Sequence, residues 1–434
     1  MQKVIFWHRR DLRIEDNAGL YHALKNEKNV VPVFIFDETI LSLLPSTDQR
    51  VLFIHQTIKS LQESYRQLGT ELHVYYGKPV ELIPEIVGNF DAKAVYANRD
   101  YEPLALERDK QLFELLTKRD VVFKGSKDHV IFEKSEVMKA DGTPYTVFTP
   151  YMRRWKEKLT DFHLKSYPVE QYVANLFQTA DRHELPTLES MGFESQKRHD
   201  FPTASFAEKI IQKYHETRDF PAVAGTSRQS LHLRFGTTSI RKLAKLASVT
   251  NEKYFNELIW RDFYQMIIFH FPHTAKDSFR REYDQIPWSR NEVHFSAWCD
   301  GKTGYPLVDA GMRELNATGH MHNRVRMVVA SFLSKHLLLD WRWGAQYFAE
   351  KLLDFELASN NGGWQWAAGC GCDAAPYFRV FNPALQLDKF DKELKYVKKW
   401  VPEYGTSAYV KPIVDHKAAR ELAISTYKTA LAKN

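Results

Sequence analysis

The sequence predicts an α/β domain built on a doubly wound parallel sheet, followed by a mainly α-helical domain. Up to about residue 130, short apolar runs rich in β-forming residues alternate with longer amphipathic segments, a pattern typical of parallel sheets whose strands are joined by helices. Beyond about residue 201 only helical periodicity remains. A chain of 434 residues is also too long for one hydrophobic core, so we expect two or three domains.

Residues 1–130 carry the signals of the α/β domain. The candidate strands are residues 4–7, 30–36, 72–76 and 94–96. The helical segments between them are residues 16–25, 47–68, 80–87 and 103–116, and Asp16 and Pro103 are residues that commonly begin helices. The domain lacks a Gly-x-Gly-x-x-Gly motif and a P-loop, so the sheet by itself indicates no dinucleotide or triphosphate site.

Residues 131–200 are mixed, with a polar passage interrupted by prolines, and we predict an interdomain connector there. Residues 201–434 form the predicted helical domain. Its candidate helices are residues 206–218, 240–247, 252–271, 306–317, 324–335 and 345–353. No fixed repeat relates these segments to one another.

The composition indicates a folded protein rich in planar side chains, with 44% hydrophobic and 14% aromatic residues. A formal net charge of +6 permits a local basic groove for nucleic acid without establishing one. The N-terminus shows no secretory apolar core and no apolar run is long enough to cross a membrane, so we expect a cytoplasmic protein.

The chain contains 3 cysteines, too few for a disulfide framework or a four-thiolate metal site. Cys370 and Cys372 could form a redox pair, but we expect all the thiols to be reduced and predict no metal site.

The least ordinary stretch of the chain is residues 354–383. Asn360 and Asn361 compete for backbone hydrogen bonds, and Gly362 and Gly363 lower helix stability, so this stretch does not look like an ordinary helix. Two tryptophans follow directly. We expect a planar, polar ligand here; the alternative is a glycine-bounded turn whose tryptophans fill the core.

This stretch resembles the DNA photolyase and cryptochrome family, most closely the class I cyclobutane pyrimidine dimer photolyases. The resemblance begins at His8-Arg9-Arg10-Asp11-Leu12-Arg13, is densest in the second half, and extends to Asn382-Pro383. It implies an FAD-binding helical domain and a light-driven lyase, a deoxyribodipyrimidine photo-lyase. In such enzymes reduced FAD, excited by blue or near-ultraviolet light, passes an electron to a flipped-out dimer in DNA, and the electron returns after the ring splits.

Two alternatives stay open beside DNA repair. A cryptochrome-type blue-light photoreceptor would bind the same FAD without repairing lesions. Such proteins often have a long C-terminal extension, whereas this sequence ends soon after Trp400. A generic flavin oxidoreductase is the other alternative, but no nicotinamide fingerprint is evident.

The resemblance implies an FAD diphosphate site at Gly225-Thr226-Ser227-Arg228-Gln229-Ser230, with Tyr214 upstream. Hydroxyl groups, one glycine and one arginine before a helical segment suit phosphate oxygens. By residue type alone, a plain helix cap explains them equally well. Leu231-His232 stands where the family usually has Pro-Tyr.

The resemblance implies a flavin-ring site formed by Asn323, Arg326, Asp354, Phe355, Glu356 and Asn360. Arg326 would pair with Asp354 beside the ring, since a buried charge is tolerable only when it is paired. Glu356 stands where aspartate is common. Asn360 would face flavin N5, and an amide there favours repair over photoreception because it does not readily supply a proton.

The lesion site implied by the resemblance begins with residues that share one side of a predicted helix: Glu257, Trp260, Arg261 and Tyr264. Asn323 and Trp366 would line the same pocket, and Arg218, Arg324 and Arg379 would meet DNA phosphates. By residue type alone, these are surface charges and core aromatics. Relatives that repair the (6-4) product have histidines at the positions of Asn323 and Met327, so these two residues favour cyclobutane dimers.

The resemblance also implies an electron-transfer route through three tryptophans. From the flavin outward, the predicted order is Trp364, Trp341, Trp298, although indoles are equally good core fillers. A second, antenna chromophore is possible: the Asn-Glu pair of folate-binding relatives is absent after Tyr101-Glu102, which leaves a deazaflavin, another flavin or no antenna. We expect a monomer that binds damaged DNA.

Overall fold

The computed structural model describes residues 2–432, which divide into two compact units. The α/β unit comprises the residues up to 136, residues 155–205 and residues 228–249. The helical unit comprises residues 137–154, 206–227 and 250 onward. The division differs from the prediction, because the expected connector is shared between the units and residues 228–249 return to the α/β unit.

The α/β unit contains a five-stranded sheet in the order β3-β2-β1-β4-β5, and every pair of neighbouring strands is parallel. The strands are β1 (Lys3–His8), β2 (Val30–Asp37), β3 (His73–Gly77), β4 (Ala92–Asn98) and β5 (Val122–Ser126). Four of them confirm the predicted strands. The fifth was missed because it is a mostly exposed edge strand with Lys124 and Gly125 in place of an apolar run.

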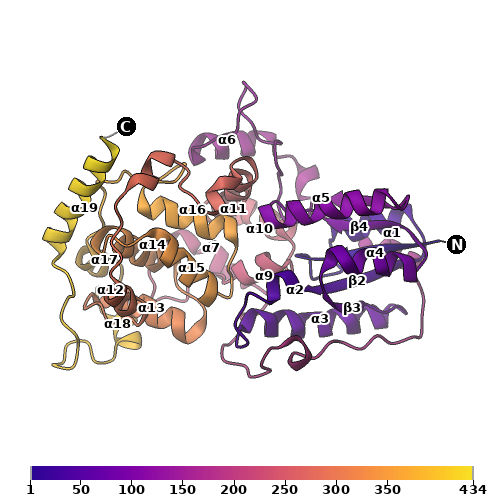
Figure 1. Ribbon diagram of the computed structural model, residues 1–434, viewed down its shortest axis with the longest axis horizontal. Helices are drawn as coiled ribbons and strands as arrows, with labels where there is room; N and C mark the ends of the chain where they lie inside the picture. The colour runs from indigo at the N-terminus through magenta and orange to yellow at the C-terminus, as the bar shows by residue number, and fades with distance from the viewer. Residues whose placement is uncertain (1, 433–434) are drawn as a thin grey trace. The chain divides into compact units, whose positions relative to one another are not determined.

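Helices cover both faces of this sheet, which confirms the doubly wound fold (Figure 1). On one face, Phe6 meets Gly19 of α1 (Ala18–Asn26), and His8 contacts Tyr65 of α3 (Gln49–Gln67). On the other face, alternate strand residues form one hydrophobic cluster with residues of α4 (Pro79–Asn89) and α5 (Pro103–Thr117). The short helix α2 (Glu38–Leu41) follows β2.

Buried ion pairs stabilise the α/β unit next to the amino end of α1. The Asp128 carboxylate accepts from Arg13 at 2.8 Å, from Arg241 at 2.8 Å and from the Ala18 backbone N–H at 3.0 Å. Burial works to raise the pKa of Asp128, but the charges of Arg13 and Arg241 outweigh burial and hold it well below its usual range. Arg241 also donates to the Asp16 carboxylate, so the segment 228–249, far along the chain, is bonded to the residues before α1.

The remaining elements are mostly helical. The α-helices are α6 (Phe148–Lys158), α7 (Glu208–Gln212), α8 (Tyr214–Thr217), α9 (Ser230–Phe235), α10 (Ile240–Thr250), α11 (Glu252–His270), α12 (Glu292–Cys299), α13 (Pro306–Thr318), α14 (Asn323–Ser331), α15 (Trp341–Lys351), α16 (Leu357–Ala368), α17 (Pro383–Phe390), α18 (Lys395–Trp400) and α19 (His416–Leu431). Short 3-10 turns lie at η1 (Asp161–Leu164), η2 (Val169–Asn175), η3 (Glu189–Met191), η4 (Pro272–Ala275) and η5 (Arg281–Gln285), and a π-helical turn at η6 (Phe332–His336).

Three predicted helices depart most clearly from their predicted bounds. The segment 206–218 is broken at Lys213 into α7 and α8. The segment 324–335 stops being α-helical after Ser331, where the π-helical turn begins. Helix α15 begins at Trp341, earlier than predicted, because the Asp340 side chain caps it by accepting from the Arg342 N–H at 3.0 Å.

The expectation that residues 360–363 are not helical is wrong, because they lie inside α16. Tertiary contacts outweigh the poor local propensity. The amides of Asn360 and Asn361 donate to carbonyl groups of other segments, Ala345 at 3.0 Å and Thr274 at 3.0 Å, and so do not compete with their own helix. Gly362 is needed because a Cβ there would lie 2.2 Å from the Tyr264 ring.

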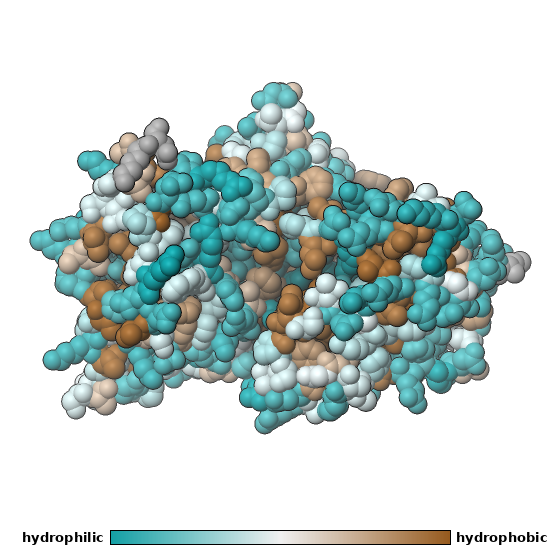
Figure 2. Space-filling view, in the orientation of Figure 1, coloured by the Kyte–Doolittle hydropathy of each residue, from teal (hydrophilic) through white to brown (hydrophobic). Residues whose placement is uncertain are grey.

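The face of the molecule seen in Figure 2 carries hydrophilic residues interspersed with separate hydrophobic patches. Within residues 2–432, none of the helices combines the length and the apolar character that crossing a membrane requires.

Candidate active site

Arg326 of α14 binds Asp354, which lies just before the start of α16. Its Nη2 donates to both oxygens of the Asp354 carboxylate at 3.0 and 3.2 Å, and its Nε donates to the Met321 carbonyl at 2.7 Å. The Asp354 side chain is only 8% exposed. The pair predicted from the sequence is therefore formed, with a fixed guanidinium at the start of α16.

Glu356 and Arg261 also form a buried pair, at 3.1 Å, with side chains 7% and 9% exposed. Glu356 accepts a second hydrogen bond from the Ser359 hydroxyl at 3.0 Å. From the sequence, Glu356 was predicted to contact the cofactor and Arg261 the lesion. In the structure each is engaged by the other, so both have a structural role that joins α11 to α16. Phe355, between the two acids, is partly buried and packs against the helical core.

Asn360 is held in one orientation. Its side-chain NH₂ donates to the Ala345 carbonyl of α15 at 3.0 Å, which fixes the amide because a carbonyl can only accept. The Asn360 carbonyl oxygen is therefore the end that can meet a ligand, and it can only accept. Gly363 lies one turn along the same face, is exposed, and has no atom within 4 Å of an added Cβ.

The predicted diphosphate segment crosses the boundary between the units, which falls between Ser227 and Arg228. In the helical unit, the Ser227 hydroxyl bonds the Tyr254 hydroxyl at 2.8 Å, and Tyr254 packs edge-on against Tyr214. Thr226, next to Ser227, is partly exposed.

In the α/β unit, Arg228 has a positive φ of 55° and an exposed side chain. Ser230 begins α9 and is exposed as well. Gln229 is 2% exposed and uses both ends of its amide within the protein, donating to the Thr203 carbonyl at 3.2 Å and accepting from Thr238 at 3.1 Å. Its side chain therefore stabilises the segment.

Helix α11 presents the predicted lesion residues. Trp260 stacks flat on Phe148, with ring centroids 3.6 Å apart and planes 6° apart. The Phe148 backbone N–H donates to Asp373 at 3.0 Å, so this ring is tied to the loop after α16. One face of the Trp260 indole is therefore covered by the protein itself. Phe148 is absent from the predicted site residues, because nothing in the sequence pattern placed it opposite residue 260.

A charged cluster lies next to Trp260. Arg218 forms an ion pair with Glu257, and Arg324 pairs with Asp219 at 2.7 Å. Arg218 and Asp219 are neighbours in sequence, with a charged-atom distance of 4.0 Å. The structure thus brings together three residues predicted for DNA or lesion binding. Burial raises the pKa of Glu257 although Arg218 acts to lower it.

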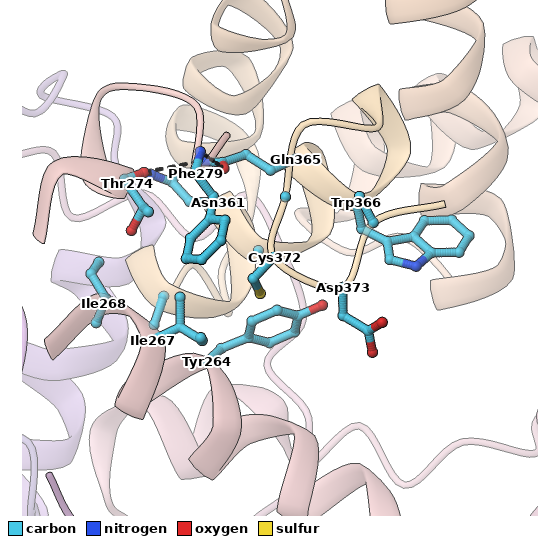
Figure 3. A pocket seen from close by; sticks show the side chains of 14 residues that line it. Tyr264, Ile267, Ile268, Thr274, Phe279, Asn361, Gln365, Trp366, Cys372 and Asp373 are labelled. Carbon is cyan, nitrogen blue, oxygen red and sulfur yellow. Dashed lines mark hydrogen bonds between the residues drawn. The ribbon is translucent and has the colours of Figure 1, made fainter. Parts of the chain in front are cut away.

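The cavity shown in Figure 3 lies between α11, α16 and the loop after α16, with Tyr264, Cys372 and Asp373 in its wall. Its volume is about 20 Å³, room for roughly one water molecule, so it is not a ligand pocket. Tyr264 packs on Gly362, and burial raises its pKa, which keeps the phenol neutral. Trp366 lines the cavity and also packs on Phe381, near the exposed Arg379.

Comparisons with known proteins identify the family of this chain. Residues 254–407 match a family described as the FAD binding domain of DNA photolyase, and residues 4–171 match one described as DNA photolyase. A deoxyribodipyrimidine photo-lyase of Synechococcus sp. is 36% identical over 480 residues, covering 99% of this chain and 98% of that one. The chain belongs to the DNA photolyase family.

Solved structures of photolyases have the same fold. A class III photolyase of Agrobacterium tumefaciens aligns with a TM-score of 0.88 and 32% identity, covering 99% of this chain and 98% of that one. An archaeal photolyase of Sulfolobus tokodaii, whose structure holds two FAD molecules, aligns with a TM-score of 0.85 and 34% identity. The alignment covers 99% of this chain and 100% of that one. A cryptochrome of Synechocystis sp. aligns with a TM-score of 0.86 and 27% identity, and the alignment covers 98% of this chain and 99% of that one.

The FAD-binding domain of this photolyase family member has features that fit a flavin ring. Asn360 offers an acceptor, Arg326 a fixed cation, and the exposed face at Gly363 leaves space for a planar group. Asn323, the first residue of α14, is exposed, and Met327 is partly exposed one turn later. These residues would hold the ring, and Thr226, Ser227 and Tyr214 of the same unit would meet the diphosphate.

The three predicted redox tryptophans are all buried, and their order from the flavin outward stays a prediction. Trp298 is 0% exposed and lies directly against Trp364, with centroids 6.0 Å apart. Trp298 therefore has no exposed surface of its own. A route through indoles to the surface would need a partly exposed indole at its outer end, and in the helical unit the partly exposed tryptophans are Trp260, Trp288, Trp343, Trp366 and Trp400.

The site also includes residues that the sequence analysis did not select. Phe148, Asp219 and Ala345 each contact a predicted residue, through a ring, a carboxylate and a backbone carbonyl. Such partners come from segments far apart in the chain, so no local pattern marks them. Among residues 2–432 no group of side chains forms a metal site, and all three cysteines are free thiols.

Proposed function

We propose that this protein is a deoxyribodipyrimidine photo-lyase that splits cyclobutane pyrimidine dimers in DNA under blue or near-ultraviolet light. The single observation that carries the proposal is the fixed amide of Asn360, an acceptor that has no acidic proton to give. Reduced FAD, when bound, supplies the photoexcited electron for splitting the dimer. The protein's own residues hold the flavin and the lesion and exclude water.

The choice of a cyclobutane dimer over a (6-4) product rests on α14. Asn323 and Met327 share one face of this helix, and Arg324 approaches the Met327 sulfur at 3.8 Å. Neither an amide nor a thioether serves as a general acid or base at neutral pH, and cyclobutane cleavage needs no such group. Polar contacts from Asn323 and Glu257 would stabilise the reduced dimer electrostatically.

Lesion recognition would use an extrahelical dimer, because a base within the duplex stack cannot reach a buried group. Trp260 would stack on the dimer with the ring face that Phe148 does not cover, and Trp366 would line the pocket. Arg218, Arg324 and the exposed Arg379 would meet backbone phosphates.

The deciding experiment uses two oligonucleotides, one with a cyclobutane thymine dimer and one with a (6-4) product, illuminated with the reduced FAD-bound protein and with dark controls. Light-dependent reversal of the cyclobutane dimer alone is expected. Reversal of the (6-4) product alone would refute the inference from Asn323 and Met327. Bound, photoreducible FAD without reversal of either lesion would replace the proposal with a cryptochrome-type photoreceptor.

We further propose a monomer acting on DNA in the cytoplasm, with a second chromophore as an optional antenna. The Sulfolobus tokodaii relative holds two FAD molecules, which supports another flavin over a folate. Gel filtration with light scattering and the absorption spectrum of pigment released from the purified protein would test these points. Dimeric mass or a folate spectrum would overturn them.

A further inference from the structure

The lesion-recognition residue Glu257 is already occupied in the protein alone. Its carboxylate is bound by the Arg218 guanidinium, and both side chains are partly exposed, at 32% and 24%. Arg218 sits at the end of α8, whereas Glu257 lies on α11, so the pair joins two elements. A strand of DNA entering this site would meet the cation and the anion together.

The two partners have opposite relations to nucleic acid. A phosphate attracts Arg218, because guanidinium groups bind phosphates with two parallel hydrogen bonds. The same phosphate repels the Glu257 carboxylate. A backbone phosphate that captures Arg218 therefore removes the countercharge from Glu257 and brings a like charge near it.

The remaining groups around Glu257 do not replace Arg218. Asp219 is negative and adds to the repulsion, while Arg324 is engaged by Asp219. Lys253, on the same helix, is the other cation that faces Glu257. The phenols that face Glu257 are Tyr214 on α8 and Tyr254 and Tyr264 on α11, and burial raises the pKa of each, so they stay neutral.

We infer that Glu257 takes up a proton when a lesion-bearing strand binds, because a strand phosphate takes over Arg218. The inference rests on the proposed function and concerns how the same site recognises its substrate. Arg218 acts as a positioning residue that favours the ionised form of Glu257 until a phosphate takes its place.

The proton changes what Glu257 can recognise. A carboxylate can only accept hydrogen bonds, whereas a neutral carboxyl has one O–H donor and one carbonyl acceptor. The pairing edge of a thymine offers an N3–H donor beside an O4 acceptor. A neutral Glu257 therefore satisfies both groups of the base, and the ionised form leaves O4 without a donor.

The sign of the pH dependence follows from this exchange. If the complex binds one more proton than the free protein, affinity rises as pH falls, by about tenfold per pH unit between the pKa of Glu257 in the free protein and its pKa in the complex. His322 also faces Asp219, but its pKa is lowered to about 4 by burial, so it stays neutral above that range and does not imitate the effect.

The test is equilibrium binding in the dark of the FAD-bound protein to an oligonucleotide with one cyclobutane thymine dimer, and to its undamaged counterpart, between about pH 5.5 and pH 8.5. Calorimetry in buffers of different ionisation enthalpy counts the protons taken up. The wild-type protein is expected to take up a proton with the lesion strand. Glu257→Gln, which keeps the shape but cannot titrate, is expected to bind without proton uptake and with a flat pH profile.

Arg218→Gln provides the second variant. Without the guanidinium, Glu257 is already more easily protonated in the free protein, so the pH dependence moves to higher pH and proton uptake near neutrality decreases. Equal proton uptake by wild type and Glu257→Gln, or none by wild type, would overturn the inference. Loss of any preference for the lesion strand over the undamaged strand would instead refute the proposed function, so the two failures are distinguishable.

Discussion

Replacing Gly362 by alanine tests how α16 is packed. An added Cβ would lie 2.2 and 2.3 Å from two carbons of the Tyr264 ring. Carbon atoms attract at about 3.5–4.0 Å, so the ring or the helix must move by more than about 1 Å. The ring has little room, since Trp260 and Phe263 pack against it with centroids 5.4 and 5.7 Å away.

The expected effect is a difference between two opposing terms. Overpacking a core costs about 1–3 kcal/mol, and the confined ring places this site at the upper end. Alanine in place of glycine inside a helix returns about 1 kcal/mol. We therefore expect Gly362→Ala to lower the free energy of unfolding by about 2 kcal/mol.

Gly363→Ala is the matched control in the same helix. Its added Cβ meets no atom within 4 Å, so only the helix-propensity term of about +1 kcal/mol applies in the FAD-free protein. If the face at Gly363 receives the flavin, this variant should also retain less FAD. The FAD-free variant would then be more stable than the FAD-free wild type, but its affinity for FAD would be lower.

Urea unfolding followed by tryptophan fluorescence, with and without FAD, compares the two variants. The comparison is internal, since the substitution is the same at adjacent positions. Equal shifts for both variants, or a stabilised Gly362→Ala, would refute the packing argument. Unchanged FAD retention in Gly363→Ala would remove the flavin from that face.

The remaining predictions concern charge, electron transfer and redox control. Asp128→Asn should lower the free energy of unfolding by about 3 kcal/mol, because the buried Arg13 loses its carboxylate partner while Arg241 keeps Asp16. In the wild type this contribution is present above the unfolded-state pKa of Asp, about 3.9, and is lost as pH falls through the depressed folded-state pKa; acid and urea titrations of both proteins measure it. Trp364→Phe should abolish light-driven reduction of oxidised FAD, because Trp364 is the indole predicted to lie next to the flavin; photoreduction at the wild-type rate in this variant, followed by absorbance, would contradict this. Asn360→Asp should remove the side-chain donor to the Ala345 carbonyl and alter flavin reduction, whereas Asn360→Gln keeps an amide donor; identical redox titrations for both variants would argue against the fixed amide.

The order of strands and helices in the α/β unit could be predicted because the apolar residues recur with a different spacing in strands and in helices. β5 could not, since its stability comes from pairing with β4 and not from an apolar run. Helix α16 shows the opposite error: local propensity argued against a helix at Asn360 and Gly362, and contacts from α15 and α11 outweighed it. Such contacts with residues far along the chain cannot be predicted from the local sequence.

In the candidate site, too, some contacts could be predicted from the sequence and others could not. Arg326 and Asp354 could be paired from residue types and family resemblance, and the structure forms that pair. Arg261 and Glu356 were assigned to different ligands, although each is the other's partner. Chemical type reveals that a buried charge needs a countercharge, but not which residue supplies it.

Helix α15 has an evolutionary consequence. Trp341 stands in its first turn, Gly344 receives the Trp364 ring so closely that a Cβ would lie 2.1 Å from it, and the Ala345 carbonyl orients Asn360. Substitutions in this one helix therefore act on the indoles and on the orientation of the Asn360 amide at once. Under the proposed roles, electron supply and cofactor tuning would be coupled through α15, so that a change to one would also alter the other.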